Sequence, residues 1–216
     1  DPMADGPVIQ LGCERALAHN TSMRDVLAMV KKFRETDNET GVALMGYLNP
    51  IEVMGYDVFA KACDDAAVDA VLVVDMPPEE SAQLSGALKS FGIQTIYLLA
   101  PTTPDYRVTT ICDHGEGYLY YVSVKGVTGS AALDIDDVKA NLARIRAKTE
   151  LPLAVGFGIK DGPTAAAVSQ VADAVIVGSA LVNCIAKNPD DVSLIKSEMS
   201  EIVSQMRVAM DALCNQ

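Results

Sequence analysis

The stretch LPLAVGFGIKDGPTAAAVSQVADAVIVGSA, residues 151–180, carries the features that decide the fold class. Two short apolar runs in it, 153–157 and 174–177, have the length and composition of buried β-strands. The sequence DGP at 161–163 lies between them and is typical of a helix start, because proline is favoured in the first helical turn. The stretch therefore predicts a strand–helix–strand unit of a parallel sheet.

Similar apolar runs recur along the whole chain, and the segments between them are long enough for helices. Their near-continuous apolar character is typical of parallel strands that are covered on both faces. The alternation of strands and helices predicts an α/β protein. The expected strands are residues 42–47, 70–74, 95–99, 118–122, 153–157 and 174–177.

Capping residues and apolar spacing predict where helices begin and which face they bury. Ser22 is a favourable N-cap, and apolar residues recur after it at helical spacing. Pro77 and Pro78 predict a helix whose first turn contains Glu79 and Glu80, where acidic side chains suit the helix dipole. The buried face of the helix after Ser22 is expected to consist of Val26, Met29, Val30 and Phe33.

The glycine-rich turns favour a barrel over an open sheet. Repeated βα units alone are compatible with a doubly wound sheet or with part of a (β/α)8 barrel. A dinucleotide-binding doubly wound fold has its glycine-rich turn after the first strand, whereas phosphate-binding barrels have theirs after the last strands. Residues 156–159 and 178–180 follow the last two expected strands. We therefore expect a single α/β domain with the (β/α)8 TIM-barrel fold.

The same two turns are candidates for a phosphate site. Glycine lets backbone N–H groups approach phosphate oxygens without a Cβ in the way, and a helix N-terminus favours an anion. One glycine pair after a strand is more often a tight turn, but two such turns on consecutive final strands favour phosphate binding. Ser179 could add a hydroxyl group, or it could instead cap the helix that follows.

The composition argues against several classes of partner. The chain has 216 residues and a formal net charge of −12. Nucleic acids and anionic membrane surfaces have the same sign of charge, so neither is an expected partner. No apolar run reaches the length of about 18 residues that predicts a membrane span. A small anionic substrate stays possible, because backbone N–H groups can bind it without lysine or arginine.

The cysteines and histidines predict neither disulfides nor a metal site. Cysteine occurs five times, an odd number, and never as C-x-x-C, which favours a reducing cytoplasmic setting. With only His19 and His114 in addition, the sequence has no spacing typical of metal ligands, and no metal is expected. The cysteines are Cys13, Cys63, Cys112, Cys184 and Cys214.

The N-terminal loop DPMADGPVIQ, residues 1–10, is the most informative motif in the chain. By composition it is a turn-rich segment before a helix, in which aspartates are usually solvated or capping. It closely resembles the signature loop of tryptophan synthase α subunits. Four further motifs similar to this family follow in the same order: LMGYLNP at 44–50, DMP at 75–77, GVTG at 126–129 and GFGI at 156–159.

The resemblance implies cleavage of indole-3-glycerol phosphate to indole and glyceraldehyde 3-phosphate, a retro-aldol reaction without a cofactor. Indole leaves only after protonation at C3, which makes its N1–H acidic, and the glycerol hydroxyl must lose its proton as the C–C bond breaks. Two carboxylates can transfer these protons. Asp5 matches the family aspartate that accepts or stabilises the indole N–H.

The other carboxylate implied by the resemblance is a glutamate on the strand before this loop, which would lie upstream of Asp1. We therefore expect an N-terminally truncated TIM-barrel domain over residues 1–216, with the first two strands absent from this chain.

The same motif matches imply further substrate contacts. Tyr120 resembles a substrate-contacting tyrosine, although a buried core tyrosine is an alternative. Thr128 resembles the threonine of a lid, residues 125–130, that closes onto Asp5. The indole pocket would be lined by Phe157, Met45, Leu72, Val74 and Leu98, which fit a core almost as well. The phosphate would be bound by Gly129, Gly158, Gly178 and Ser179.

The family works as an αββα heterotetramer, in which indole passes to a pyridoxal-phosphate β subunit, so the resemblance implies this partner. The implied contact loops are residues 1–5, 49–50, 75–77 and 126–129. All except the first follow expected strands, so they would share one face with the mouth of the active site.

Two alternatives remain open on the sequence. Another phosphate-binding barrel enzyme, such as an indole-glycerol-phosphate synthase or a sugar-phosphate isomerase, would share the fold. The synthase is expected to have a catalytic lysine on an early strand, and the expected strands of this chain contain no lysine. The chain could also be a non-catalytic fragment that binds the β subunit and lacks the proton-transferring glutamate.

Overall fold

The strands form one parallel sheet in which the order in space follows the order in the chain. A computed structural model describes residues 4–123, 134–156 and 158–214. In this part of the chain each strand pairs in parallel with the next, in the order β1-β2-β3-β4-β5-β6. A doubly wound sheet would reverse its order at a switch point. That alternative is wrong, and the observed order is that of a (β/α)8 barrel.

The observed strands lie within a residue of the predicted runs. They are β1 Ala43–Gly46, β2 Ala70–Val73, β3 Gln94–Leu99, β4 Leu119–Val122, β5 Leu153–Gly156 and β6 Ala174–Ile176. The helices are α1 Pro7–Ala18, α2 Met23–Arg34, α3 Leu48–Met54, α4 Tyr56–Asp65, α5 Ala82–Lys89, α6 Asp105–His114, α7 Ile135–Arg146, α8 Gly162–Ser169, α9 Ser179–Lys187 and α10 Val192–Cys214.

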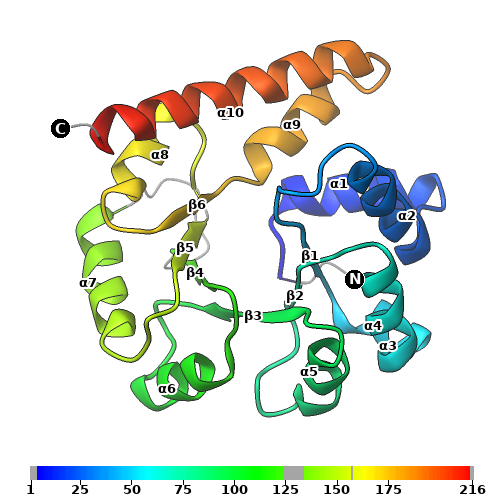
Figure 1. The fold of residues 1–216 in the computed structure, drawn as a ribbon. Helices are drawn as coiled ribbons and strands as arrows, with labels where there is room; N and C mark the ends of the chain where they lie inside the picture. The colour runs from blue at the N-terminus through cyan, green and yellow to red at the C-terminus, as the bar shows by residue number, and fades with distance from the viewer. Residues whose placement is uncertain (1–3, 124–133, 157, 215–216) are drawn as a thin grey trace.

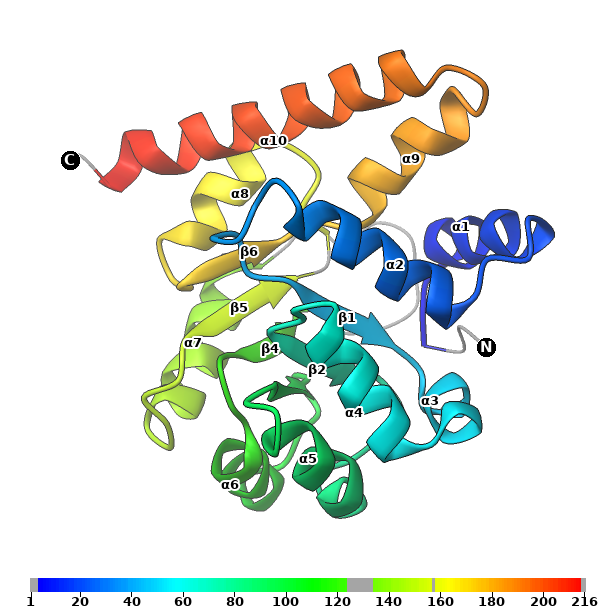
Figure 2. The same cartoon turned by 45° about the vertical axis from the view of Figure 1, so that its right-hand side comes forward.

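The sheet is curved, and the helices lie around its outer side (Figure 1). The long helix α10 packs on α8 and α9, and it crosses above both in Figure 2. Helix α1 packs against α9 through a close approach, since a Cβ at Gly12 would lie 3.1 Å from Val182 Cγ1. This contact brings the beginning of the chain next to the helix that follows β6.

The two faces of the sheet belong to different apolar clusters. The outward-facing strand residues pack with helices in two clusters, one around Val71 and Val73 and one around Tyr121 and Val155. A third cluster contains residues of the strands and their ends without any helical residue, so it is the inner face of the curved sheet. Its members are Ala70, Leu72, Val74, Ile96, Leu98, Tyr118 and Tyr120.

Two of the predicted helix starts have side-chain caps, of which the one at Ser22 was predicted. The Ser22 side chain accepts a hydrogen bond from the Asp25 N–H, and the Asp25 carboxylate accepts one from the Ser22 N–H, which completes a capping box. At α8 the Asp161 side chain accepts a hydrogen bond from the Thr164 N–H at 2.9 Å. Both helices therefore begin where the sequence indicated.

The same contacts lower the pKa of the two capping carboxyl groups, because hydrogen bonds stabilise the charged form. At Asp25 the hydrogen bond from the Ser22 hydroxyl has the largest effect on the pKa, followed by the one from the Ser22 N–H. At Asp161 the hydrogen bond from the Thr164 hydroxyl has the largest effect, followed by the one from the Thr164 N–H.

Two other helix predictions were wrong in part. Residues 78–80 form a turn, and α5 begins only at Ala82, so Glu79 and Glu80 lie before the helix. In α2 the buried residue is Leu27, while Met29 is 58% exposed and Phe33 is 39% exposed. Val30 was predicted correctly, and with Met23 and Leu27 it forms the stripe at helical spacing that packs against the sheet and its helices.

The N-terminal ends of two strand pairs are connected by the same kind of arginine–aspartate contact. Arg34, at the end of α2, donates to Asp69 Oδ2 at 2.6 Å, and the same oxygen accepts from the Val42 N–H at 2.7 Å. Arg146, at the end of α7, donates to Asp173 Oδ2 at 2.8 Å, which also accepts from the Leu153 N–H at 2.8 Å. Each arginine thus connects a helix end to two neighbouring strands.

Among the residues that the structure describes, no helix combines the length and the hydropathy needed to cross a membrane.

Candidate active site

Asp5 is held by a tyrosine at the end of β1. The Tyr47 hydroxyl donates to Asp5 Oδ2 at 2.8 Å and accepts a hydrogen bond from the Ala4 N–H at 3.0 Å. Burial, the hydrogen bond to Asp5 and the nearby carboxylates raise the pKa of Tyr47 to about 12, so the phenol stays a donor near neutral pH. The N-terminal loop is therefore attached to the C-terminal end of the sheet.

Tyr120 lies between this loop and the end of β5. Burial raises its pKa, and Tyr118 and the negative charge of Asp5 raise it further, which places Asp5 within electrostatic reach of the phenol. On the other side, a Cβ at Gly156 would lie 2.3 Å from Tyr120 Oη. The phenol therefore occupies space that only glycine leaves open at position 156.

The predicted indole-binding residues share the inner face of the sheet. Leu72 is buried, and Val74, Leu98 and Tyr120 are partly buried members of the same cluster. Met45 is in register with Leu72, so its side chain projects from the same face, but it is 54% exposed because β1 is an edge strand in the described part of the sheet. Together they form an apolar wall beside Tyr120, on which a flat heterocycle can stack.

The predicted phosphate-binding turns follow β5 and β6. Gly158 has a φ of +77°, a left-handed conformation that favours glycine, and it is exposed. Gly178 is the N-cap of α9 and Ser179 is its first residue, so Ser179 does not have the capping role left open by the sequence. A Cβ at Gly178 would lie 3.8 Å from Ile9 Cδ1, which places the start of α9 beside the helix that follows Asp5.

The residue before the implied partner-contact loop 49–50 is hydrogen-bonded to the implied contact loop 75–77. The Leu48 N–H, in the first turn of α3, donates to Asp75 Oδ1 at 2.8 Å. Asn49, Pro50 and Asp75 are exposed, whereas Met76 is buried. Because the strands are parallel, both loops lie at the edge of the sheet that carries Tyr47.

Several predicted site residues lie outside the described part of the chain. These are Thr128 and Gly129 with the rest of the lid 125–130, and Phe157. Within the described part, no group of three or more histidine, cysteine, aspartate or glutamate side chains could hold a metal ion.

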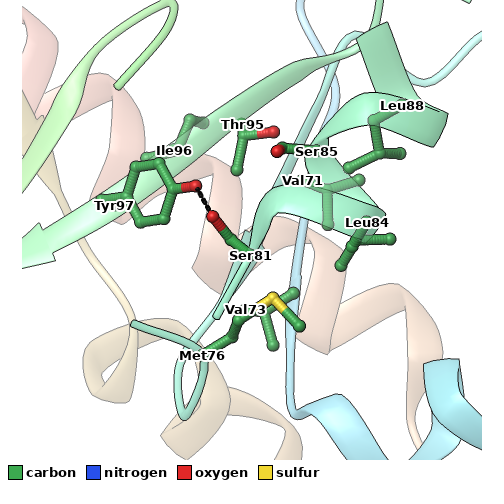
Figure 3. Close-up of a pocket in the computed structure, with 10 residues that line it drawn as sticks. All are labelled: Val71, Val73, Met76, Ser81, Leu84, Ser85, Leu88, Thr95, Ile96 and Tyr97. Atoms are coloured by element: carbon green, nitrogen blue, oxygen red, sulfur yellow. Dashed lines mark hydrogen bonds between the residues drawn. The ribbon is translucent and has the colours of Figure 1, made fainter. Parts of the chain in front are cut away.

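A small cavity lies on the outer side of the sheet, away from these residues. It has a volume of about 10 Å³ and lies between β2, β3 and α5, where Ser81, Thr95 and Tyr97 are among its lining side chains (Figure 3). The Ser81 hydroxyl donates to the Pro78 carbonyl at 2.9 Å and is hydrogen-bonded to the Tyr97 hydroxyl at 2.5 Å. This space is about that of one water molecule, so it cannot take an indole ring.

Tyr47 and Asp75 are candidates for the active site that sequence reasoning did not assign to it. Both residues belong to motifs quoted for the family resemblance. A signal was present, because Tyr47 ends one expected strand and Asp75 directly follows another, where parallel sheets carry their functional side chains. Their partners, Asp5 and Leu48, come from segments distant in the sequence, and only the folded structure brings them together.

Comparisons with known proteins agree with this geometry. A family model described as tryptophan synthase alpha chain matches residues 1–211. The tryptophan synthase alpha chain of Thioalkalivibrio sulfidiphilus is 59% identical over 211 residues, which cover 98% of this chain and 79% of the relative. The corresponding protein of Marinobacter nauticus is 54% identical over 215 residues, covering 100% and 80%.

Solved structures show the same similarity. Tryptophan synthase subunit alpha from Legionella pneumophila superposes with a TM-score of 0.87 at 46% identity, covering 98% of this chain and 78% of that one. A chain from the tryptophan synthase a2b2 complex of Pyrococcus furiosus gives a TM-score of 0.85 at 33% identity, covering 95% and 82%.

Proposed function

The chain belongs to the tryptophan synthase alpha chain family, and we propose that it cleaves indole-3-glycerol phosphate to indole and glyceraldehyde 3-phosphate in tryptophan biosynthesis. The observation that carries this proposal is the position of Asp5, which the Tyr47 hydroxyl binds at 2.8 Å and whose charge helps to raise the pKa of Tyr120, a residue of the apolar inner wall. A carboxylate next to an apolar wall suits a substrate that combines a heterocycle with an acidic N–H.

Asp5 acts on the indole nitrogen in this proposal. Protonation at C3 leaves an indolenine-like ring with an acidic N1–H, and an ionised carboxylate within hydrogen-bond distance of N1 lowers the energy of that species. The C–C bond then breaks as the glycerol hydroxyl loses its proton. The family resemblance assigns the C3 and hydroxyl protons to a glutamate whose position would lie upstream of Asp1.

We assign the two ends of the substrate to different residues at the C-terminal end of the sheet. Leu72, Val74, Leu98 and Met45 take one face of the indole ring, with Tyr120 at its edge. Backbone N–H groups at Gly158 and at the start of α9, Gly178 and Ser179, bind the phosphate. Phe157, Thr128 and Gly129 complete this assignment as expectations from the resemblance.

The proposed partner is a tryptophan synthase β subunit, in the αββα arrangement implied by the family. A solved relative is part of an a2b2 complex, and the exposed loops at Asn49, Pro50 and Asp75 lie at the same edge of the sheet as Asp5. We assign the whole of residues 1–216 to one TIM-barrel domain and place the protein in the cytoplasm, in keeping with unpaired cysteines such as Cys63 and Cys112.

Turnover by Asp5→Asn tests the assignment. In the complete α subunit assembled with its β subunit, this change should lower kcat for indole formation by about 100-fold or more, since general acid–base groups contribute that much. Asp57→Asn, at an exposed carboxylate in the first turn of α4, is the control and should leave kcat unchanged. Indole formation by Asp5→Asn at the control rate would show that Asp5 has no part in the reaction.

Substrate choice tests the class of enzyme. The unsubstituted protein should release indole from indole-3-glycerol phosphate and should not isomerise sugar phosphates that lack the heterocycle. A protein that binds the β subunit but releases no indole would instead support the non-catalytic alternative.

A further inference from the structure

The Tyr47 hydroxyl uses both of its hydrogen-bonding functions on the loop that carries Asp5. It donates to Asp5 Oδ2 at 2.8 Å and accepts from the Ala4 N–H at 3.0 Å. A carboxylate has two oxygens, so a donor on Oδ2 leaves Oδ1 to accept the indole N–H. Two contacts on consecutive residues restrict both the position of the loop and the rotation of the carboxylate.

Tyr47 is itself fixed to the end of the sheet. It is the N-cap residue of α3, and the next residue, Leu48, donates its N–H to Asp75 Oδ1 at 2.8 Å. The preceding residue, Gly46, is in register with Val73 and its carbonyl accepts from the Val74 N–H at 2.9 Å. The phenol therefore projects from a backbone that hydrogen bonds hold on both sides, while Asp5 lies on a loop before α1.

We propose that Tyr47 is a positioning residue for the lyase reaction, which holds the Asp5 carboxylate in the orientation that accepts the indole N–H. This inference rests on the proposed function. The raised pKa of Tyr47, about 12, agrees with it, because a phenol that stays protonated remains a donor to the carboxylate. A residue of this kind acts on the reaction step and not on the binding of the phosphate.

The variant Tyr47→Phe keeps the ring and removes only the hydroxyl. Its kcat should fall by about 10- to 100-fold, the range expected when a reacting group is displaced by a fraction of its contact distance. The KM for indole-3-glycerol phosphate should stay within about threefold, because the phosphate contacts are elsewhere. Tyr56→Phe is the matched control, since the Tyr56 hydroxyl also donates to a carboxylate, that of Glu52, on the outer helices.

A double-mutant cycle separates positioning from a general structural role. If Tyr47 acts through Asp5, adding Tyr47→Phe to Asp5→Asn should change kcat by less than about twofold, because the group being positioned is already gone. Slow rates are measured in single turnovers with enzyme in excess. A full additional loss in the Asp5→Asn background, a change in KM alone, or wild-type kcat for Tyr47→Phe would each overturn the proposal.

The same cycle tests the positioning role of Tyr47 and the proposed function separately. A large effect of Asp5→Asn with no effect of Tyr47→Phe would refute the positioning role and leave the proposed function standing. No effect of Asp5→Asn would refute both.

Discussion

The hydroxyl of Tyr120 occupies the place where a side chain at Gly156 would have to begin. A Cβ at Gly156 would lie 2.3 Å from Tyr120 Oη and 2.5 Å from its Cε2. Tyr120 lies in β4 and Gly156 ends β5, so this is a contact between neighbouring strands on the inner face of the sheet. The identity of one residue thus sets the position of the phenol beside Asp5.

Gly156→Ala should therefore lower both the activity and the stability of the protein. The new methyl group forces the Tyr120 ring away from its place, and we expect kcat/KM to fall by about 10- to 100-fold, with a loss of about 1–3 kcal/mol in the free energy of unfolding. Steady-state cleavage assays and urea unfolding measure the two effects. Gly46→Ala is the control, because a Cβ there meets no atom within 4 Å. Equal activity of the two variants would contradict the prediction.

Arg34→Ala should destabilise the protein without changing its chemistry. The Arg34 side chain is 9% exposed and donates to Asp69 and to the carbonyls of Ala67, Asp37 and Thr40. Removing it takes a donor from all four acceptors, of which Asp69 keeps the Val42 N–H, and should cost about 2–3 kcal/mol in urea unfolding. These contacts lie at the N-terminal ends of the strands, away from Asp5, so kcat/KM should be unchanged.

Lys61→Ala is the matched control for that measurement. Lys61 pairs with Asp65 on the exposed surface of α4, and its removal should change the free energy of unfolding by less than about 0.5 kcal/mol. Similar losses of unfolding free energy for the two variants would mean that the burial of Arg34 does not add to the stability of the protein.

Two substitutions at the small outer cavity should change the free energy of unfolding in opposite directions. Thr95 Oγ1 is buried and has no hydrogen-bond partner among the described residues, so Thr95→Val should stabilise the protein by about 1 kcal/mol. Ser81→Ala removes the bonds to Tyr97 and to the Pro78 carbonyl and should destabilise it by about 1–2 kcal/mol. Urea unfolding measures both, and a loss of stability in Thr95→Val would show that its hydroxyl is satisfied.

Stability should decline as the pH rises above about 9. Burial raises the pKa of both Cys63 and Tyr121 to about 12, above their unfolded values. Between the unfolded and folded pKa values the folded state binds more protons, so the stabilisation is complete below the unfolded pKa and is lost as the pH rises through the folded one.

A series of urea titrations from about pH 7 to about pH 11 tests this dependence. In Cys63→Ala the decline should begin closer to about pH 10, where only the tyrosines still titrate. An unfolding free energy that stays constant over the whole series would show that burial does not raise the pKa values of Cys63 and Tyr121.

The order and position of the strands were predictable because buried parallel strands are apolar along their whole length. Each run could be recognised locally, and glycine-rich turns such as 156–159 then favoured the barrel. Helix starts at Ser22 and Asp161 were predictable for the same reason, since their caps involve residues only three positions away.

The errors arose where local sequence allowed two outcomes. Helix α2 has two apolar stripes at helical spacing, and only its neighbours in space decide that Leu27 is buried and Met29 is exposed. Proline and glutamate at 77–80 suit a helix start, yet the buried Ser81 hydroxyl bonds to the Pro78 carbonyl and the segment forms a turn.

The candidate site was predictable only in part. Asp5, Tyr120 and the glycine turns were named from motifs, but composition fitted a core almost as well for residues such as Leu72. What joins them is contact between distant segments: Tyr47 with Asp5, Tyr120 with Gly156, and Ile9 beside Gly178. No local pattern contains that information.

The sequential order of the strands has a consequence for how the chain folds. Every strand pairing joins segments that are separated by one helix-containing connection, so the loops that must close are short in comparison with those of a sheet whose order is shuffled. Each βα unit can dock on the one before it as it emerges from the ribosome, and the sheet grows in the direction of synthesis. The contact of α1 with α9 is different in kind, because it must wait until all six strands and α9 itself have been made.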